Sequence, residues 1–164
     1  MIRLIAAYLI AVATLVTPAK ASPDMAELWG KEAASLEKQT ADLIANIDMG
    51  GAHQMPDSYV IDVSRFGRMA HGLAIWNDTS GGAKDLGCIF RGMATESEDQ
   101  TMDLLDVEDN LTARDHLKRL ESMFSDAQLI ARAAAAQSPM PTLSRQPANE
   151  ACPMEMEATR RALQ

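Results

Sequence analysis

Apolar residues recur at intervals of three and four along four stretches of the chain, the spacing that places them on one face of an α-helix. The first stretch covers about residues 23–48, with Pro23 suited to the first helical position and Gly50-Gly51 ending the pattern. Its apolar face consists of Met25, Leu28, Trp29, Leu36, Leu43, Ile44 and Ile47. Alternating apolar and polar positions, the pattern of strands, are almost absent after residue 22, so the sequence predicts an all-α protein.

A second helix is expected from about Ser58 to Asp78, and Gly81-Gly82 end it. Its apolar stripe consists of Tyr59, Val63, Phe66, Ala70, Leu73 and Asn77. A third helix begins near Ala83 and weakens at residues 106–110. Its apolar side consists of Leu86, Phe90, Met93, Ser97 and Leu104.

The fourth helix is expected to open at Thr112 and Asp115, which are spaced like a capping box with aspartate in the acid position. Its apolar stripe consists of Leu117, Leu120, Phe124, Ala127, Ile130 and Ala134. Pro139 and Pro141 forbid its extension. The pattern leaves open whether the third and fourth helices are separate or form one long kinked helix, and it favours separation.

Four amphipathic helices of similar length with short links favour an up-down-up-down four-helix bundle. In that topology the third helix starts, and the fourth ends, at the end of the bundle where the first helix begins. We expect the bundle to occupy residues 22–137. A proline-containing tail, residues 138–164, then leaves from this end, with a short terminal helix packed on the bundle.

The N-terminus, residues 1–21, has the layout of a secretory signal peptide. Arg3 precedes an uncharged apolar run over residues 4–16, and small residues at Ala19 and Ala21 fit the positions that a signal peptidase reads. The run is shorter than the roughly 20 residues of a membrane span, although an N-terminal anchor or a buried helix is an alternative. We therefore expect cleavage after Ala21, a periplasmic or secreted location and no membrane association afterwards.

Export bears on the two cysteines of the chain, Cys88 and Cys152. An exported protein with two cysteines usually oxidises them to each other. The bundle topology places Cys88, near the start of the third helix, at the end from which the tail with Cys152 departs. The sequence therefore predicts a disulfide that anchors the C-terminal tail across this end.

The charge of the chain argues against two classes of partner. The sequence has 15 basic and 23 acidic residues, and loss of Arg3 and Lys20 takes the net charge from −8 to −10. Nucleic acids and anionic membrane surfaces repel such a protein. The sequence also lacks a nucleophile elbow, an H-E-x-x-H motif and a C-x-x-C motif. No residues form a plausible acid–base or nucleophilic set, which disfavours an enzyme and a bound cofactor.

Copper handling is the alternative function that the sequence allows. Of 11 methionines, ten follow the signal peptide, and there are three histidines. The topology places His53 and Met55 in the loop after the first helix and His116 near the start of the fourth, at one end of the bundle. Met49 lies just before that loop, and Met102 near the end of the third helix could join them. Thioether and imidazole ligands suit copper. Methionine also packs irregular helical cores, and this is the preferred interpretation.

The second helix offers the clearest interaction surface. Outside its stripe it keeps four further apolar residues: Ile61, Met69, Ile75 and Trp76. A helix that is apolar nearly all round is buried on more than one side, either by the tail, by a protein partner or by a second copy of the chain.

A second candidate surface is the acidic run over residues 96–109, which contains no lysine or arginine. Its first four acids are Glu96, Glu98, Asp99 and Asp103. They form either a solvated face or a docking patch for a basic partner. Together these features predict an exported, non-enzymatic helical interaction protein whose partner the sequence does not identify.

Overall fold

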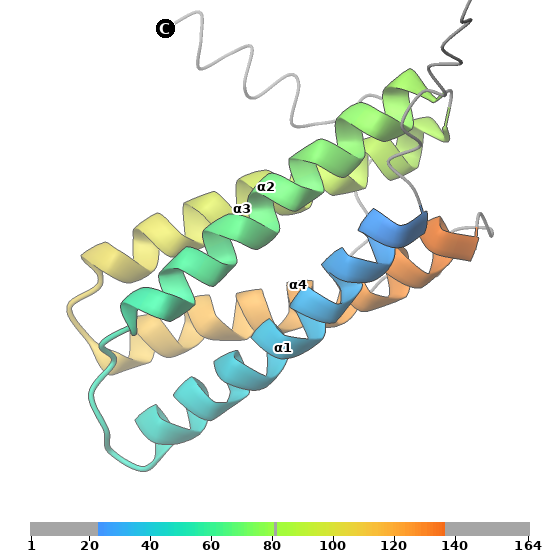
Figure 1. Ribbon diagram of the computed structural model, residues 1–164. Helices are drawn as coiled ribbons and strands as arrows, with labels where there is room; N and C mark the ends of the chain where they lie inside the picture. The colour runs from blue at the N-terminus through green and yellow to red at the C-terminus, as the bar shows by residue number, and fades with distance from the viewer. Residues whose placement is uncertain (1–22, 81, 137–164) are drawn as a thin grey trace, which may run out of the picture.

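The computed structural model describes residues 23–80 and 82–136, which form four helices joined by short connections (Figure 1). They are α1 (Pro23–Asp48), α2 (Asp57–Thr79), α3 (Lys84–Asp106) and α4 (Asn110–Ala136). Successive helices run in opposite directions, and the described residues contain no strand. The predicted all-α, up-down-up-down bundle is confirmed.

The bundle has two ends, which we call basal and apical (Figure 1). The basal end holds the start of α1, the turn between α2 and α3, and the end of α4. The apical end holds the α1–α2 loop and the α3–α4 link.

The bundle consists of two closely packed antiparallel pairs, α1 with α4 and α2 with α3, while α1–α2 and α3–α4 contacts are sparser. Small residues allow each close approach. A Cβ atom on Gly30 would lie 2.7 Å from the Cβ of Ala131 in α4. A side chain on Gly67 would likewise collide with Ser97 of α3. Glycine at both positions lets the paired backbones come together.

Each helix contributes one aromatic ring to the centre of the core. The ring of Trp29 stacks on that of Phe66 with centroids 4.9 Å apart, and it meets Phe90 edge-on at 5.3 Å. Phe66 also meets Phe124 edge-on at 5.0 Å. Trp29 Nε1 donates a hydrogen bond to the Phe66 carbonyl (3.2 Å), so the buried indole nitrogen is satisfied. Each such ring pair contributes about 0.5–1.5 kcal/mol beyond its area burial, and together they join the two helix pairs.

The buried hydroxyl groups of Thr40 and Tyr59 are hydrogen-bonded to each other. The Thr40 hydroxyl donates to the Leu36 carbonyl (2.7 Å) and lies 2.8 Å from the Tyr59 hydroxyl. Because the single proton of Thr40 is already used, Tyr59 is the donor in the second bond. Burial raises the pKa of Tyr59 far above its ordinary value, so this phenol stays protonated.

The turn between α2 and α3 explains a polar residue in the predicted stripe of the second helix. Asn77 is buried, and its side-chain amide donates to the Ala83 carbonyl (2.8 Å). The backbone carbonyl of Asn77 accepts a hydrogen bond from the Gly82 amide (2.7 Å). A Cβ on Gly82 would overlap the Asn77 side chain, so the turn closes tightly around this asparagine.

The link between α3 and α4 settles the question that the pattern left open. Val107 is extended (φ −73°, ψ 140°), and the two helices are separate. The predicted cap of the fourth helix at Thr112 is wrong. The Asp109 carboxylate caps α4 instead, because it accepts from the Thr112 amide (2.9 Å) and from the Thr112 hydroxyl (2.7 Å). The chain turns directly after Val107, so α4 begins before the predicted box and Thr112 lies in its first turn.

The apolar stripes of the second and fourth helices are buried throughout, as predicted. In α1, however, Leu28 is 58% exposed, so its assignment to the core face is wrong. The buried line runs through Ala26, Trp29 and Ala33. The neighbouring Gly30 lies against Ala131 of α4. Leu28 is about 100° away from Trp29 around the helix and therefore points to solvent.

Candidate functional site

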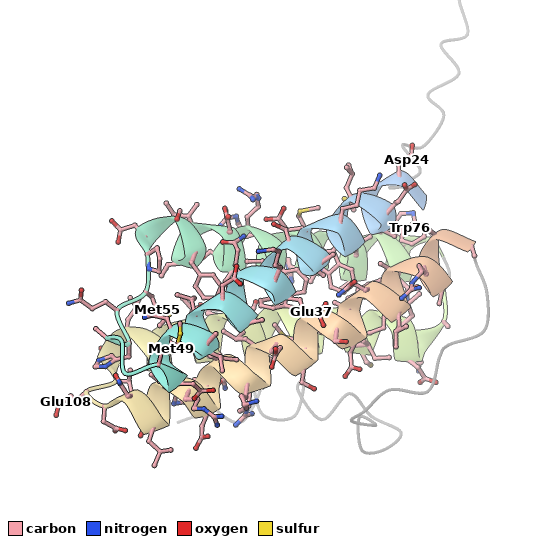
Figure 2. The ribbon with its side chains drawn as sticks, turned by 90° about the horizontal axis from the view of Figure 1, so that it is seen from below. Asp24, Glu37, Met49, Met55, Trp76 and Glu108 are labelled. Carbon is pink, nitrogen blue, oxygen red and sulfur yellow. The ribbon has the colours of Figure 1, made fainter. Side chains whose placement is uncertain are left out.

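The four apolar residues predicted to form a surface on α2 divide into two kinds. Ile61 and Ile75 are 58% and 53% exposed. Met69 and Trp76 are partly buried and pack against the core, with Trp76 at the basal end (Figure 2). Only the two isoleucines remain available to a partner.

Arg68 lies midway between these isoleucines, seven residues from each. Seven residues are about two helical turns, so all three side chains lie on the same side of α2. Arg68 is exposed and forms no ion pair or hydrogen bond with the described residues. The neighbouring Arg65, in contrast, is paired with Glu32 and with Asp62. We refer to Ile61, Arg68 and Ile75 as the α2 ridge.

The four predicted acidic residues of α3 also divide. Glu96 accepts from Arg119 of α4 (2.8 Å), and Asp103 Oδ2 lies 3.7 Å from His116 Nδ1. These two acids therefore connect α3 to α4. Glu98 and Asp99 form no ion pair with the described part of the chain, and they are the residues of the predicted docking patch that stay unpaired.

The predicted copper ligands lie at the apical end but have separate partners. His53 Nδ1 is 2.8 Å from Asn110 Oδ1, at the start of α4. His116 Nδ1 is 2.7 Å from Gln100 Oε1 of α3. Met55 is half-buried against the core. Across residues 23–80 and 82–136, no three or more His, Cys, Asp and Glu side chains are grouped so that they could hold a metal ion.

Cys88 lies in the second turn of α3, near the basal end, and is half-buried. Arg91 Nη2 is 3.8 Å from its sulfur atom. Its predicted partner, Cys152, lies outside the described residues, as do the predicted signal peptide (1–21) and the tail (138–164).

The sequence pattern did not single out Arg68 or Asn110. A signal for Arg68 existed, since it stands seven residues from each of two isoleucines outside the core stripe. Asn110 carried no such signal, because its partners His53 and Gly51 lie almost 60 residues earlier in the chain.

No protein-family model, curated protein or solved structure matches the chain. None of the helices in the described part of the chain has the length and hydrophobicity to span a bilayer.

Proposed function

We propose that this chain is an exported, non-enzymatic interaction protein that binds a helix of a partner protein through the α2 ridge. One observation carries the proposal. Two isoleucines are more than half exposed on one line of α2, and an arginine without an ion pair in the described bundle lies between them. Exposed apolar side chains that line up on a helix are a common docking surface for a second amphipathic helix.

The charge of Arg68 defines the chemistry of the partner. In a symmetric pair of two copies joined by this ridge, Arg68 would face its own counterpart across the two-fold axis. Two like charges brought together in a desolvated contact oppose association. The ridge therefore fits a different chain, whose helix presents a glutamate or aspartate with an apolar residue seven positions to each side.

Export is part of this proposal. The predicted cleavage after Ala21 would remove only residues that precede α1, which begins at Pro23. All four described helices would remain in the mature chain. The partner then belongs to the periplasm or the exterior.

A Cys88–Cys152 disulfide that anchors the tail is the finer part of the proposed fold. Its support is the position of Cys88 near the basal end, where α4 ends at Ala136. The bond would close a loop of about 65 residues, which in the chain-entropy model stabilises the fold by roughly 4 kcal/mol. The mature protein should have a mass about 2 Da below that of its reduced form. Two titratable thiols in the native protein would exclude the bond.

A designed helical peptide can stand in for the partner helix in a test of the ridge. The peptide carries leucine, glutamate and leucine at seven-residue spacing, and a second version has lysine in place of glutamate. We expect the mature protein to bind the glutamate peptide about tenfold more tightly, equal to 1.4 kcal/mol. Arg68→Glu should reverse this preference, and Ile61→Asp should abolish binding.

Leu28→Asp is the matched control, because Leu28 is as exposed as Ile61 but lies on α1. Its binding should equal that of the wild type. Equal affinity for both peptides, or loss of binding in the Leu28 variant, would rule out the ridge. A concentration-dependent dimer that Ile75→Asp dissociates would replace the partner helix by a second copy of the chain.

A further inference from the structure

The loop between α1 and α2 contains three side chains with soft or borderline metal-binding atoms. Met49, His53 and Met55 lie within seven consecutive positions. Met49 is 81% exposed, although methionine is a residue that usually helps to fill a core. Met49 and Met55 both lie at the apical end of the bundle (Figure 2).

A chain of hydrogen bonds fixes the ring of His53. The side-chain amide of Asn110 donates from Nδ2 to the Gly51 carbonyl (2.9 Å), which leaves Oδ1 to face His53 Nδ1 at 2.8 Å. Since Oδ1 is only an acceptor, Nδ1 must carry the proton. The lone pair of the neutral imidazole is therefore on Nε2, which has no hydrogen-bond partner in the described bundle.

The loop is also held from the α1 side. The Asn46 side chain donates to the Ala52 carbonyl (3.2 Å), and the Asn46 carbonyl accepts from the Gly51 amide (2.9 Å). Gly50 adopts a left-handed conformation (φ 86°), which turns the chain back after α1. Contacts from α1 and from α4 thus set the shape of the loop before any ligand arrives.

We propose that this loop binds one Cu(I) ion through the sulfur atoms of Met49 and Met55 and Nε2 of His53. Thioether ligands select soft monovalent copper, and imidazole accompanies them well. Asn110 is the positioning residue. A metal-bound histidine commonly donates its other N–H to an oxygen, and that bond sets the tautomer and the direction of the ring.

This assignment keeps His53 and Met55 from the ligand set expected from the sequence and has Met49 in place of His116. His116 belongs to another element, and its Nδ1 is engaged by Gln100 of α3, whereas Met49 belongs to the same short loop as His53. Two of the three proposed ligands are methionines. The site therefore differs in type from a group of three or more His, Cys, Asp and Glu side chains, which the described residues do not contain. The proposal does not depend on the α2 ridge.

Cu(I) itself is the probe. The mature protein is titrated under anaerobic conditions against a chromophoric Cu(I) chelator, and we expect one ion to bind. Met49→Leu, Met55→Leu and His53→Gln should each weaken binding by about tenfold or more. Leucine preserves the volume of methionine, so the fold should be retained, and circular dichroism checks this.

Three control variants test whether Cu(I) binds at this loop or at methionine and histidine side chains elsewhere in the chain. Met25→Leu at the basal end and His71→Gln on the exposed side of α2 should bind Cu(I) as the wild type does. Ile61→Asp should also bind normally, which distinguishes this site from the ridge.

The Cu(I) affinity of two Asn110 variants tests whether the side chain positions His53 through an acceptor atom. Asn110→Leu should weaken Cu(I) binding by about 10–100-fold, and Asn110→Asp, which keeps an acceptor for Nδ1–H, should restore much of it. Absence of stoichiometric Cu(I) in the wild type would overturn the proposal. Full binding by the Met49→Leu, Met55→Leu double variant, or loss of binding on His116→Gln alone, would also overturn it.

Discussion

Gly30 of α1 lies against Ala131 of α4 so closely that a Cβ atom on residue 30 would come within 2.7 Å of the Ala131 Cβ. Alanine normally stabilises a helix interior relative to glycine by about 1 kcal/mol. Here the colliding atom is fixed to the α4 backbone, and the helices would have to separate at a cost of about 1–3 kcal/mol. We expect Gly30→Ala to lower the free energy of unfolding by about 1 kcal/mol, measured by urea denaturation.

Gly72→Ala is the matched control for that substitution. Its added Cβ would meet only the terminal carbon of Met25, at an ordinary contact distance of 3.9 Å. The gain in helix propensity should then stand alone and raise the free energy of unfolding by about 0.5–1 kcal/mol. If both glycine variants shifted stability in the same direction, the close α1–α4 packing would be wrong.

The aromatic cluster should dominate the stability of the core. Phe66 is fully buried between the rings of Trp29 and Phe124, so Phe66→Ala should cost about 3–5 kcal/mol, measured by equilibrium denaturation. Ile75→Ala on the same helix removes an exposed side chain and should change stability by less than about 0.5 kcal/mol. A small effect at Phe66 would contradict a cluster that joins all four helices.

Trp76 and Ile75 are neighbours in sequence with different surroundings. Trp76 packs against the core, so Trp76→Arg should lower the free energy of unfolding by about 1–3 kcal/mol. Ile75→Arg should leave thermal unfolding nearly unchanged, because Ile75 is already exposed. A Trp76→Arg protein that melts like the wild type but no longer associates would move Trp76 to an interface instead.

The Asp109 cap predicts a dependence on pH. Hydrogen bonds from the Thr112 amide and hydroxyl hold the pKa of Asp109 below its usual value. The carboxylate therefore contributes stability that is fully present above the unfolded pKa of about 3.9 and is lost as the pH falls through the lower folded pKa. Thermal unfolding of wild type and Asp109→Ala should differ at neutral pH and converge in acid. A difference that is independent of pH would exclude the charged cap.

The periodicity of α2 and α4 was sufficient to predict their buried faces, because apolar residues such as Val63 and Phe124 recur there at intervals of three and four. It failed at Leu28, since α1 buries the small residues Ala26 and Ala33 while the larger Leu28 points outward. Small buried residues create close approach but give a weak hydrophobic signal.

The hydrogen-bond partners of polar residues were the second feature that the sequence could not predict. Thr40 is buried because Tyr59 of another helix satisfies it, and Asp109 caps α4 because the chain turns just before it. Local spacing alone could not choose between Asp109 and Thr112, which both suit a cap.

For the candidate sites, the sequence identified the right elements but could not rank their residues. It proposed Ile61, Ile75, Met69 and Trp76 as equals, whereas burial separates them. Periodicity does not show how far neighbouring helices extend around α2. It also could not place Asn110 beside His53, since that contact depends on how the two loops at the apical end meet.

The pairing of α1 with α4 has a consequence for how the chain acquires its fold. The first helix has its closest partner in the last described helix, so α1 cannot bury the face around Gly30 until α4 has been made. The contacts that complete the core are therefore distant in sequence, which slows folding relative to a chain that pairs only neighbouring helices. A nascent chain that ends before Asn110 would keep that face open.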